Sequence, residues 1–345
     1  MKIAVVGATG VVGDTILRVL EERGSPVTRL DAFASRERDA LHFRGEPLPV
    51  RAAVADVLAA ERYDAVLFAS SDDASAELAP PVLASGAVVI DNSATYRLDA
   101  GVPLIVPEVN PGAIGQRDAL FPVANCSVIV LVVALAPFVR AAGLRAVRVA
   151  TYQAVSGAGR AGLDALAGEE RSVFAGGAGE RDPASPFRAP IVRNVVPQVG
   201  SFDAFGDSSE EKKVVAETRK ILELPELHVA ATTVRVPVLR AHSVAVFFKT
   251  ERDTDVTELG AALAAAPGVA YHAEGIVTPR EVEGQDLVHV ARLRAEDGSR
   301  RHFQMWVVGD QLRKGAATNA VQILEELHAR GRFAPRDVRE SAGAR

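Results

Sequence analysis

The feature that most constrains the fold is the start of the chain, where a short apolar run leads into the glycine pattern GATGVVG. Lys2 to Val6 is rich in β-branched residues and predicts a strand, and the residues after Gly13 repeat apolar side chains at helical spacing. A strand, a glycine turn and a helix are typical of a dinucleotide-binding unit, because glycines let the backbone approach a pyrophosphate and the helix N-terminus binds its charge. The alternative is a tight turn that needs glycine only for packing.

The rest of the first third of the chain alternates strand-like and helical segments, as a doubly wound sheet requires. Segments 63–71, 76–86 and 87–94 predict a strand, a helix and another strand. The polar residues that follow the strands should face the cofactor, because ligands bind at the carboxyl ends of parallel strands. These residues are Ser70, Ser71, Asn92 and Ser93.

The second expected strand, Val27 to Ala34, should end beside the adenosine ribose of a bound dinucleotide. NAD sites place an acidic residue there to hold the ribose 2′-hydroxyl. This chain has Ser35, Arg36 and Arg38 instead. A hydroxyl and a guanidinium suit a 2′-phosphate, so NADP is favoured over NAD. Asp31 and Glu37 lie nearby, and the alternative for the arginines is a solvated loop.

The chain has a single cysteine, Cys126, in the segment ANCS ahead of a long apolar run. Asn125 is a good N-cap, so the run predicts a helix of about a dozen residues that ends near Gly143, with the thiol in its first turn. The helix dipole and the unpaired amides there favour an anion and lower the pKa of a thiol. A lone cysteine is more often a core residue than a nucleophile, so partners elsewhere in the chain must decide.

Candidate partners for the thiol come from later strand-like runs. His242 lies between the runs 230–238 and 243–249 and should stand at a strand edge. Arg235 lies inside the first run, where an arginine is costly unless it pairs with an anion. That anion is either a protein carboxylate or a substrate, and the residues alone favour neither.

Two further segments offer polar side chains. Segment 151–162, TYQAVSGAGRAG, ends a β run at Gln153 and continues as a glycine-rich loop. Such a loop allows close approach of a cofactor, or merely opens the next helix, which is expected to begin near residue 163. A capping box over residues 208–211 opens a charged helix on which Glu210 and Lys213 share a face. The ordinary interpretation of that helix is a solvent-exposed, salt-bridged surface.

Composition excludes several classes of protein. With 345 residues, 48% hydrophobic and 24% charged, the chain is typical of a soluble globular protein of about two domains. The net charge of −5 and the scattered basic residues argue against a nucleic-acid surface, and the longest apolar run, interrupted by Pro137, is too short for a membrane span. One cysteine cannot form an internal disulfide and no signal peptide is recognisable, so a cytoplasmic location is expected. No metal site is expected, because no histidine pair has zinc-site spacing.

Together, nine short motifs resemble the aspartate-semialdehyde dehydrogenase family, in the family's order and through nearly the whole chain. They are GATGVVG, SRER, DNSATYR, VPEVN, ANCS, TYQAVSGAG, EEKKVVAETRKI, VRVPVLRAHS and KGAATNAVQI. The resemblance implies reversible, NADPH-dependent reductive dephosphorylation of L-aspartyl 4-phosphate to L-aspartate 4-semialdehyde through a cysteine thioester, in biosynthesis of lysine, threonine, methionine and isoleucine. It also implies a small-molecule substrate, inorganic phosphate and a homodimer, without nucleic acid or membrane.

The resemblance assigns roles position by position. The positions matched to catalytic residues are Cys126 as the acylated nucleophile, His242 as the acid/base residue and Gln153, which orients the acyl group. The positions matched to substrate contacts are Arg235 for the carboxylate, Glu210 for the amino group, and Arg97 and Lys213 for phosphate. The cofactor-binding positions, from the glycine turn and the resemblance together, are Gly7, Thr9, Gly10, Val11, Val12, Gly13, Ser35, Arg36, Ser156, Gly157 and Asn319.

The chain departs from the family pattern at a few positions beside these residues. Many members have proline where this chain has Ala124, Ser-Thr in place of Ser127 and Val128, and glutamate in place of Val244. These differences affect helix packing and the surroundings of the site rather than the reacting groups. Two alternatives remain. One is an N-acetyl-γ-glutamyl-phosphate reductase, whose nucleophile segment resembles GCYPT rather than NCSVI, and the other is an inactive nucleotide-binding paralogue.

The implied fold class is α/β, with an N-terminal Rossmann-like NADP-binding domain and an α+β catalytic and dimerisation domain that has a mixed or antiparallel sheet. Residues 1–123 with 315–345 should form the first domain, and residues 124–314 the second. The second sheet is expected from ATYQAVS, VAATTVRVPV, SVAVFFKT, LVHVARLRA and HFQMWVVG. A terminal helix over 316–329 should return to the first domain, residues 173–190 should form a long loop, and the tail after Phe333 should be polar and frayed.

Overall fold

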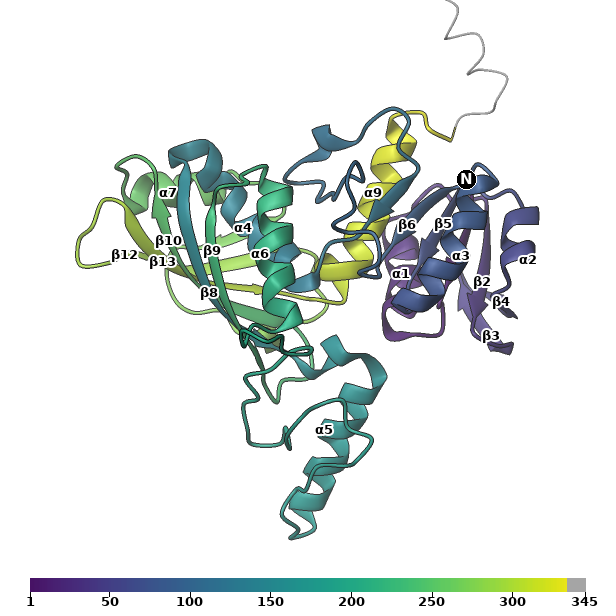
Figure 1. Cartoon of the computed structure of the whole chain (residues 1–345), viewed down its shortest axis with the longest axis horizontal. Helices are drawn as coiled ribbons and strands as arrows, with labels where there is room; N and C mark the ends of the chain where they lie inside the picture. Colours follow the sequence, from purple (N-terminus) through teal and green to yellow (C-terminus); the bar gives the residue numbers. More distant parts are fainter. Residues whose placement is uncertain (334–345) are drawn as a thin grey trace, which may run out of the picture. The chain divides into compact units, whose positions relative to one another are not determined.

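The computed structural model describes residues 1–333, which form two compact units (Figure 1). The first unit contains Met1–Pro107, Pro111–Val123 and the C-terminal part from Ala317 onward. The second contains Glu108–Asn110 and Ala124–Ala316. The predicted tail after Phe333 lies outside the described residues.

The sheet of the first unit has seven strands in the order β3-β4-β2-β1-β5-β6-β7. Every neighbouring pair is parallel except the β3–β4 hairpin. β1 lies between β2 and β5, so the switch point of a doubly wound sheet falls at the carboxyl end of β1, where the glycine turn begins. The strands are β1 (Lys2–Val6), β2 (Arg29–Ala34), β3 (Arg38–Phe43), β4 (Glu46–Ala52), β5 (Ala65–Phe68), β6 (Val88–Asp91) and β7 (Leu120–Pro122).

Helices cover this sheet on both faces. Ala4 and Val6 of β1 pack into one apolar cluster with Leu58 of α2 (Ala55–Ala60) and Leu78 of α3 (Asp72–Ala84). The intervening side chain of Val5 points to the opposite face and is also fully buried, so that face is covered too. α1 (Val11–Glu22) and α9 (Thr318–Ala329) pack against each other, and η1 (Pro111–Ala113) is a short 3₁₀ turn.

The second unit is built on a six-stranded mixed sheet in the order β11-β12-β13-β10-β8-β9. The outer pairs β11–β12 and β8–β9 are parallel and the central pairs are antiparallel, which confirms the predicted mixed sheet. The strands are β8 (Leu144–Gln153), β9 (His228–Arg235), β10 (His242–Thr250), β11 (Val269–His272), β12 (Val288–Ala295) and β13 (His302–Gly309).

Helices pack on one face of this sheet, namely α4 (Cys126–Ala142), α6 (Ser209–Leu222) and α7 (Val256–Ala264). Phe248 of β10 points toward them and stacks on Phe138 of α4 with ring centroids 4.7 Å apart. The alternate residue Phe247 therefore points to the other face, where its side chain is 42% exposed. α5 (Gly159–Phe174) and the chain after it project away from the sheet (Figure 1). The short elements are η2 (Val155–Ala158), α8 (Pro279–Val282) and the π-helical turn η3 (Arg313–Ala317).

Some boundaries differ from those predicted. β3 and β4 were not predicted, because their exposed, charged sequence carries little strand signal. α4 runs for 17 residues rather than a dozen, because its central position on the sheet buries nearly all of its side chains. α5 begins at Gly159 rather than near residue 163, since Gly162 packs so closely that a Cβ there would lie 2.2 Å from the carbonyl oxygen of Val155.

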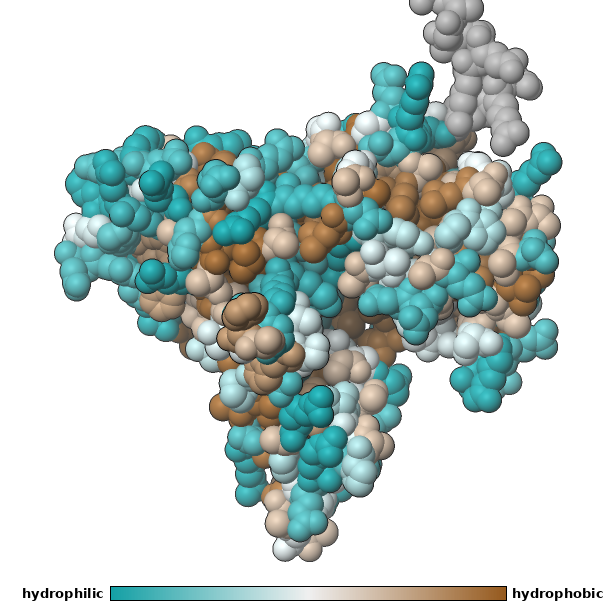
Figure 2. Space-filling model, viewed as in Figure 1, coloured by the Kyte–Doolittle hydropathy of each residue, from teal (hydrophilic) through white to brown (hydrophobic). Residues whose placement is uncertain are grey.

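Two properties of the described part of the chain bear on its class. Across residues 1–333, the longest and most apolar helix falls short of what crossing a membrane requires. The same residues hold no group of three or more His, Cys, Asp or Glu side chains placed to bind a metal ion. Figure 2 shows hydrophilic and hydrophobic residues interspersed on the face in view.

Candidate active site

The glycine turn after β1 lines a cavity of about 420 Å³ in the first unit. Gly7 has φ +83°, and a Cβ there would lie 2.3 Å from the carbonyl oxygen of Ala69. A Cβ at Gly13 would lie 2.2 Å from the carbonyl oxygen of Gly7, so neither position accepts a side chain. The turn is therefore bare backbone at the sheet's switch point, which fits a pyrophosphate. Other residues around the cavity are Thr9, Gly10, Ser35, Ser70 and Ser71.

The end of β2 has the features expected for a 2′-phosphate. Ser35 and Arg36 directly follow β2 and are exposed. The nearby carboxylate of Asp31 accepts a hydrogen bond from the Tyr63 hydroxyl at 2.7 Å and pairs with Arg29 at 2.8 Å. These contacts already engage the Asp31 carboxylate. The groups left at the end of β2 are the Ser35 hydroxyl and the Arg36 guanidinium, which suit the 2′-phosphate of NADP.

The other predicted residues of the first unit lie on separate elements. Val11 and Val12 open α1, whose N-cap is Gly10. Asn319 on α9 is fully buried and donates from Nδ2 to the carbonyl oxygen of Ile105 at 3.0 Å. Arg97 is 9% exposed and donates from Nη2 to the carbonyl oxygen of Asn92 at 2.8 Å.

Cys126 is the first residue of α4, in the second unit. Asn125 caps the helix as predicted, because its Oδ1 accepts the backbone N–H groups of Ser127 and Val128 at 2.9 and 3.3 Å. Gly315 lies against the cysteine, since a Cβ at Gly315 would be 3.0 Å from Cys126 Cβ. The thiol thus lies at the positive end of a buried helix, with backbone on one side.

The carboxylate of Glu210 links three parts of the site. Its Oε1 accepts from Asn125 Nδ2 at 2.9 Å and from Gln153 Nε2 at 3.1 Å. Glu210 is only 8% exposed, so the predicted solvent-exposed face is wrong at this position. The reason is tertiary, since α6 packs between α4 and β9 and turns Glu210 inward. Lys213, on the same helix, is half-buried.

His242 begins β10 and is fully buried. Its Nδ1 accepts the backbone N–H of Ala154 at 3.0 Å. Burial, and then the charge of Arg235, hold the pKa of His242 well below its usual 6.5. The ring is therefore neutral, and because Nδ1 is an acceptor its proton is assigned to Nε2. Nε2 has no hydrogen-bond partner among residues 1–333.

Arg235 ends β9 beside His242. It is 6% exposed, and its Nη1 donates to the carbonyl oxygen of Ala154 at 2.7 Å. Burial lowers the pKa of the guanidinium, and electrostatic interactions with Cys126 and Glu210 oppose that shift. The sequence predicted an anionic partner for Arg235, either a protein carboxylate or a substrate. Within the site, its guanidinium interacts electrostatically with the Glu210 carboxylate and with Cys126.

The glycine-rich loop after β8 lies close to these two side chains. A Cβ at Gly157 would be 2.7 Å from Arg235 Nη1 and 3.1 Å from His242 Nε2, so a side chain there would displace one or both of these groups. Ser156 is 3% exposed, donates its hydroxyl to the carbonyl oxygen of Leu239 and accepts from Gln311 Nε2. The side chain of Ser156 is thus committed to holding the loop.

The structure gathers several predicted residues within the second unit, namely Cys126, Gln153, Glu210, Arg235, His242 and Gly157. Arg97 and the glycine-turn residues belong to the first unit. Sequence reasoning missed Gly315 and Glu217, the latter of which accepts the backbone N–H of Asn125 at 2.6 Å. A signal for Glu217 exists, since it lies seven residues after Glu210 and so shares its helix face.

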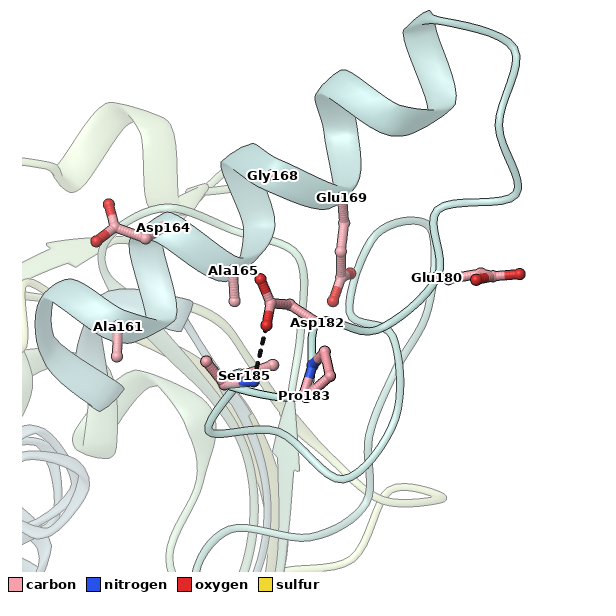
Figure 3. Close-up of a pocket in the computed structure, with 10 residues that line it drawn as sticks. Ala161, Asp164, Ala165, Gly168, Glu169, Glu180, Asp182, Pro183 and Ser185 are labelled. Carbon is pink, nitrogen blue, oxygen red and sulfur yellow. Dashed lines mark hydrogen bonds between the residues drawn. The ribbon is translucent and has the colours of Figure 1, made fainter.

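A separate cavity of about 480 Å³ lies between α5 and residues 180–185 (Figure 3). Glu169 and Asp182 line it, and the Oε2 atom of Glu169 accepts the backbone N–H groups of Ile191 and Val192 at 2.6 and 2.8 Å. These bonds tie the following chain to α5. None of the predicted site residues lines this cavity.

Comparisons with known proteins give a consistent picture. The family model described as semialdehyde dehydrogenase, NAD binding domain, matches residues 2–117, and the one described as semialdehyde dehydrogenase, dimerisation domain, matches residues 135–314. The chain is 40% identical over 338 residues to an aspartate-semialdehyde dehydrogenase of Aquifex aeolicus, covering 96% of this chain and 98% of that protein.

Solved structures agree with the sequence matches. A crystal structure of aspartate semialdehyde dehydrogenase II from Vibrio cholerae, complexed with ASA, has a TM-score of 0.90 and 38% identity over 95% of this chain and 98% of that one. The Candida albicans enzyme with NADP shares the fold, with a TM-score of 0.73 and 21% identity over 96% of this chain and 99% of that one. On these matches, the chain belongs to the aspartate-semialdehyde dehydrogenase family.

Proposed function

We propose that the chain catalyses the reversible, NADPH-dependent reductive dephosphorylation of L-aspartyl 4-phosphate to L-aspartate 4-semialdehyde through a thioester on Cys126. This reaction belongs to the biosynthesis of lysine, threonine, methionine and isoleucine. The observation that carries the proposal is the grouping of a helix-start thiol with a buried neutral imidazole, a buried guanidinium and a glutamine–glutamate pair. Membership of the family supports the choice of substrate.

The charges of the site suit an amino acid. Arg235 would bind the substrate carboxylate, and Glu210 would bind its amino group. Gln153 donates to Glu210 Oε1 and accepts from Thr151 Oγ1 at 3.1 Å, so its amide is held in one orientation. A fixed amide can hold the acyl group in line with the nucleophile. An acetylated substrate would offer Glu210 no ammonium group, which favours the aspartyl substrate over the N-acetyl-γ-glutamyl one.

The thiolate of Cys126 is the nucleophile. The helix N-terminus and the positive charge of Arg235 both favour it. Its sulfur attacks the acyl carbon, a C–S bond forms, and the bond from carbon to the phosphate oxygen breaks. Arg97 and Lys213 would receive the leaving phosphate, whose electron pair is ultimately protonated from solvent.

His242 acts as a hydrogen-bond donor in this scheme. With Nδ1 occupied by the Ala154 N–H, the neutral ring can offer only Nε2–H to the reacting atoms. The expectation that His242 accepts the thiol proton does not fit this tautomer, because Nδ1 already accepts the Ala154 N–H. In this scheme the thiol proton is lost to solvent instead. Nε2–H would stabilise the oxygen anion of each tetrahedral intermediate and the sulfur as it leaves.

Bound NADPH supplies the hydride that reduces the thioester carbonyl. Residues Thr9 to Val12 would hold the pyrophosphate through backbone amides, and Ser35 with Arg36 would hold the 2′-phosphate. The cofactor positions in the second unit are Ser156 and Gly157. Collapse of the reduced adduct breaks the C–S bond, releases the aldehyde and leaves the electron pair on Cys126.

The partners follow from the same proposal. Inorganic phosphate is the co-substrate of the reverse reaction. The exposed face of the second sheet would form a homodimer, in keeping with the match to a dimerisation domain. A cytoplasmic location would keep the thiol of Cys126 reduced.

Replacement of Cys126 by alanine tests the proposal. Phosphate-dependent reduction of NADP with L-aspartate 4-semialdehyde should be abolished, because no other cysteine can form the thioester. NADPH binding, followed by fluorescence titration, should remain nearly unchanged. Turnover by the Cys126→Ala variant would contradict the proposal. Wild-type assays with NAD, and with N-acetyl-L-glutamate 5-semialdehyde, serve as controls and should be slow.

A further inference from the structure

Glu217 carries a buried carboxyl group that the proposed reaction does not use. The residue is fully buried on α6, and its Oε2 accepts the backbone N–H of Asn125 at 2.6 Å. A buried carboxylate is costly unless it is well hydrogen-bonded, and an N–H···O⁻ bond of this length is strong. The carboxylate therefore has a specific partner, the residue directly before the nucleophile.

Asn125 is held at every polar group that it has. Its N–H donates to Glu217, and its Nδ2 donates to Glu210. Its Oδ1 caps α4, and its carbonyl oxygen accepts the N–H of Ile129 at 2.9 Å. With all four groups engaged, neither the backbone nor the side chain of Asn125 can rotate without breaking a buried hydrogen bond. The start of α4, and with it Cys126, is fixed by these bonds.

A single rigid helix supplies both carboxylates. Glu210 and Glu217 are seven residues apart, so they lie two turns apart on one face of α6. Glu210 also binds Gln153 and faces the proposed substrate. Glu217 instead contacts Asn125 through its Oε2 atom, and an effect of this hydrogen bond on turnover would pass through Asn125 and Cys126.

We propose that Glu217 is a positioning residue, which fixes the start of α4 through the Asn125 N–H and thereby directs the Cys126 thiol. The inference deepens the proposed function and rests on it for the identity of the reaction, whereas the orientation of the thiol can be tested without substrate. The charge and the geometry of Glu217 act in opposite directions on Cys126. A carboxylate disfavours a nearby thiolate, while the hydrogen bond places the sulfur.

Several charged or titratable groups lie near the start of α4. Arg235 of β9 interacts electrostatically with Cys126 and favours the thiolate, and His242 of β10 is neutral. Glu210 and Glu217 of α6 bind Asn125, and their charges would oppose the thiolate. Lys314, next to Gly315, is paired with Glu108 at 2.6 Å. Removal of the Glu217 charge should therefore shift the ionisation of Cys126 to lower pH. Loss of the hydrogen bond should instead misplace the thiol, and a displacement of about 1 Å can cost roughly 100-fold in rate.

Three variants separate these effects. Glu217→Gln keeps the size and an acceptor oxygen but removes the charge, and Glu217→Leu removes both the charge and the acceptor. Glu226→Gln, at an exposed position just beyond α6, is the matched control for loss of one negative charge. For each protein, kcat and KM are measured with L-aspartate 4-semialdehyde and phosphate. The pH dependence of iodoacetamide alkylation of Cys126 is measured without any ligand.

Glu217→Leu should lower kcat roughly 100-fold with KM nearly unchanged, because Glu217 does not contact substrate. Glu217→Gln should retain more of kcat and move the alkylation profile to lower pH, whereas Glu226→Gln should match the wild type. Should Glu217→Leu fail to fold, Glu217→Gln alone decides through its alkylation profile. A wild-type kcat with a wild-type alkylation profile would overturn the inference, as would a rise in KM at constant kcat. Turnover by Cys126→Ala would instead refute the proposed function and leave the alkylation result standing.

Discussion

The backbone of Ala154 joins two buried polar side chains of the site. Its N–H donates to His242 Nδ1, and its carbonyl oxygen accepts from Arg235 Nη1. The tautomer of His242 is thus fixed by a backbone N–H. In many acid/base pairs a carboxylate fixes the tautomer instead. A backbone amide cannot be titrated, so the donor role of Nε2 persists over a wide range of pH.

The donor role predicts an unusual substitution pattern at His242. In His242→Gln, the side-chain oxygen can accept the Ala154 N–H and the NH₂ group can donate where Nε2–H does. This variant should therefore retain at least roughly tenfold more kcat/KM than His242→Ala, since a lost donor to a developing anion costs about 10²–10³ in rate. Steady-state assays across the pH range give the comparison. Equal losses in both variants would indicate a proton acceptor, which glutamine cannot replace.

The low pKa of His242 also predicts how stability depends on pH. In the folded protein burial keeps the ring neutral well below pH 6.5, whereas in the unfolded chain it titrates near that value. As pH falls through about 6.5, the unfolded state binds a proton that the folded state does not, so the free energy of unfolding decreases. His242→Gln lacks this contribution to the pH dependence.

Urea unfolding of the wild type and of His242→Gln between about pH 8 and about pH 5 measures this effect. The stability advantage of the wild type should shrink as the pH is lowered. A constant difference between the two proteins would mean that His242 has the same pKa in the folded and unfolded states.

At the scale of helices and strands, the local signals in the sequence predicted what they control. The glycine turn after β1, the Asn125 cap of α4 and the capping box of α6 each depend on a few neighbouring residues, and all three are present. The burial of Glu210 could not be predicted from its own helix, whose sequence is charged throughout. It depends on α6 packing beside α4 and β9, which only the tertiary fold determines.

The position of His242 illustrates the same limit. The sequence predicted that it stands at the edge of a strand, and it is the first residue of β10. Its tautomer depends on Ala154, which is 88 residues away in sequence and lies beside it in the fold. No local pattern contains that contact, so the resemblance could suggest an acid/base residue but not its protonation state.

The capping box of α6 provides an element-scale prediction. The Ser208 hydroxyl accepts the N–H of Glu211 at 3.2 Å, while the Glu211 side chain accepts the N–H of Ser208 at 2.7 Å. Ser208→Ala should lower the free energy of unfolding by about 1 kcal/mol. Because α6 carries Glu210, fraying of its first turn should also raise KM for L-aspartate 4-semialdehyde.

A second cap in the same unit serves as the control. Asp255 caps α7 by accepting the N–H of Glu258 at 2.9 Å, and α7 contributes none of the candidate site residues. Asp255→Ala should reduce stability by a similar amount and leave KM at the wild-type value. If both variants changed KM equally, the effect would reflect general loss of stability rather than the position of α6.

At the scale of the whole molecule, the two units correspond to different parts of the proposed reaction. We propose that residues 1–123 with 315–345 bind the cofactor and that residues 124–314 carry catalysis and dimerisation. The short segments Glu108–Asn110 and 315–316 are exceptions, because both belong to the second unit. Glu108 forms an ion pair at 2.6 Å with Lys314, which is fully buried. Sequence patterns do not reveal such a pairing across 206 residues.

The face of the second sheet opposite α4 predicts the oligomeric state. It presents Phe247 and Tyr152, which are 42% and 39% exposed, and Tyr152 packs against Trp306 with ring centroids 5.3 Å apart. Exposed aromatic residues on a regular sheet are typical of a protein interface, and aromatic side chains contribute most where they become buried. A second copy of the chain would bury this face in the proposed homodimer.

Phe247→Asp should therefore convert the dimer into a monomer, because a carboxylate buried at the interface would be desolvated without a partner. Light scattering after size-exclusion chromatography at several protein concentrations measures the mass. Phe205→Asp is the matched control, since Phe205 is 93% exposed in the turn before α6 and the variant should remain dimeric. A dimeric Phe247→Asp protein would show that the copies associate through another surface. A monomeric wild type would remove the homodimer from the proposal altogether.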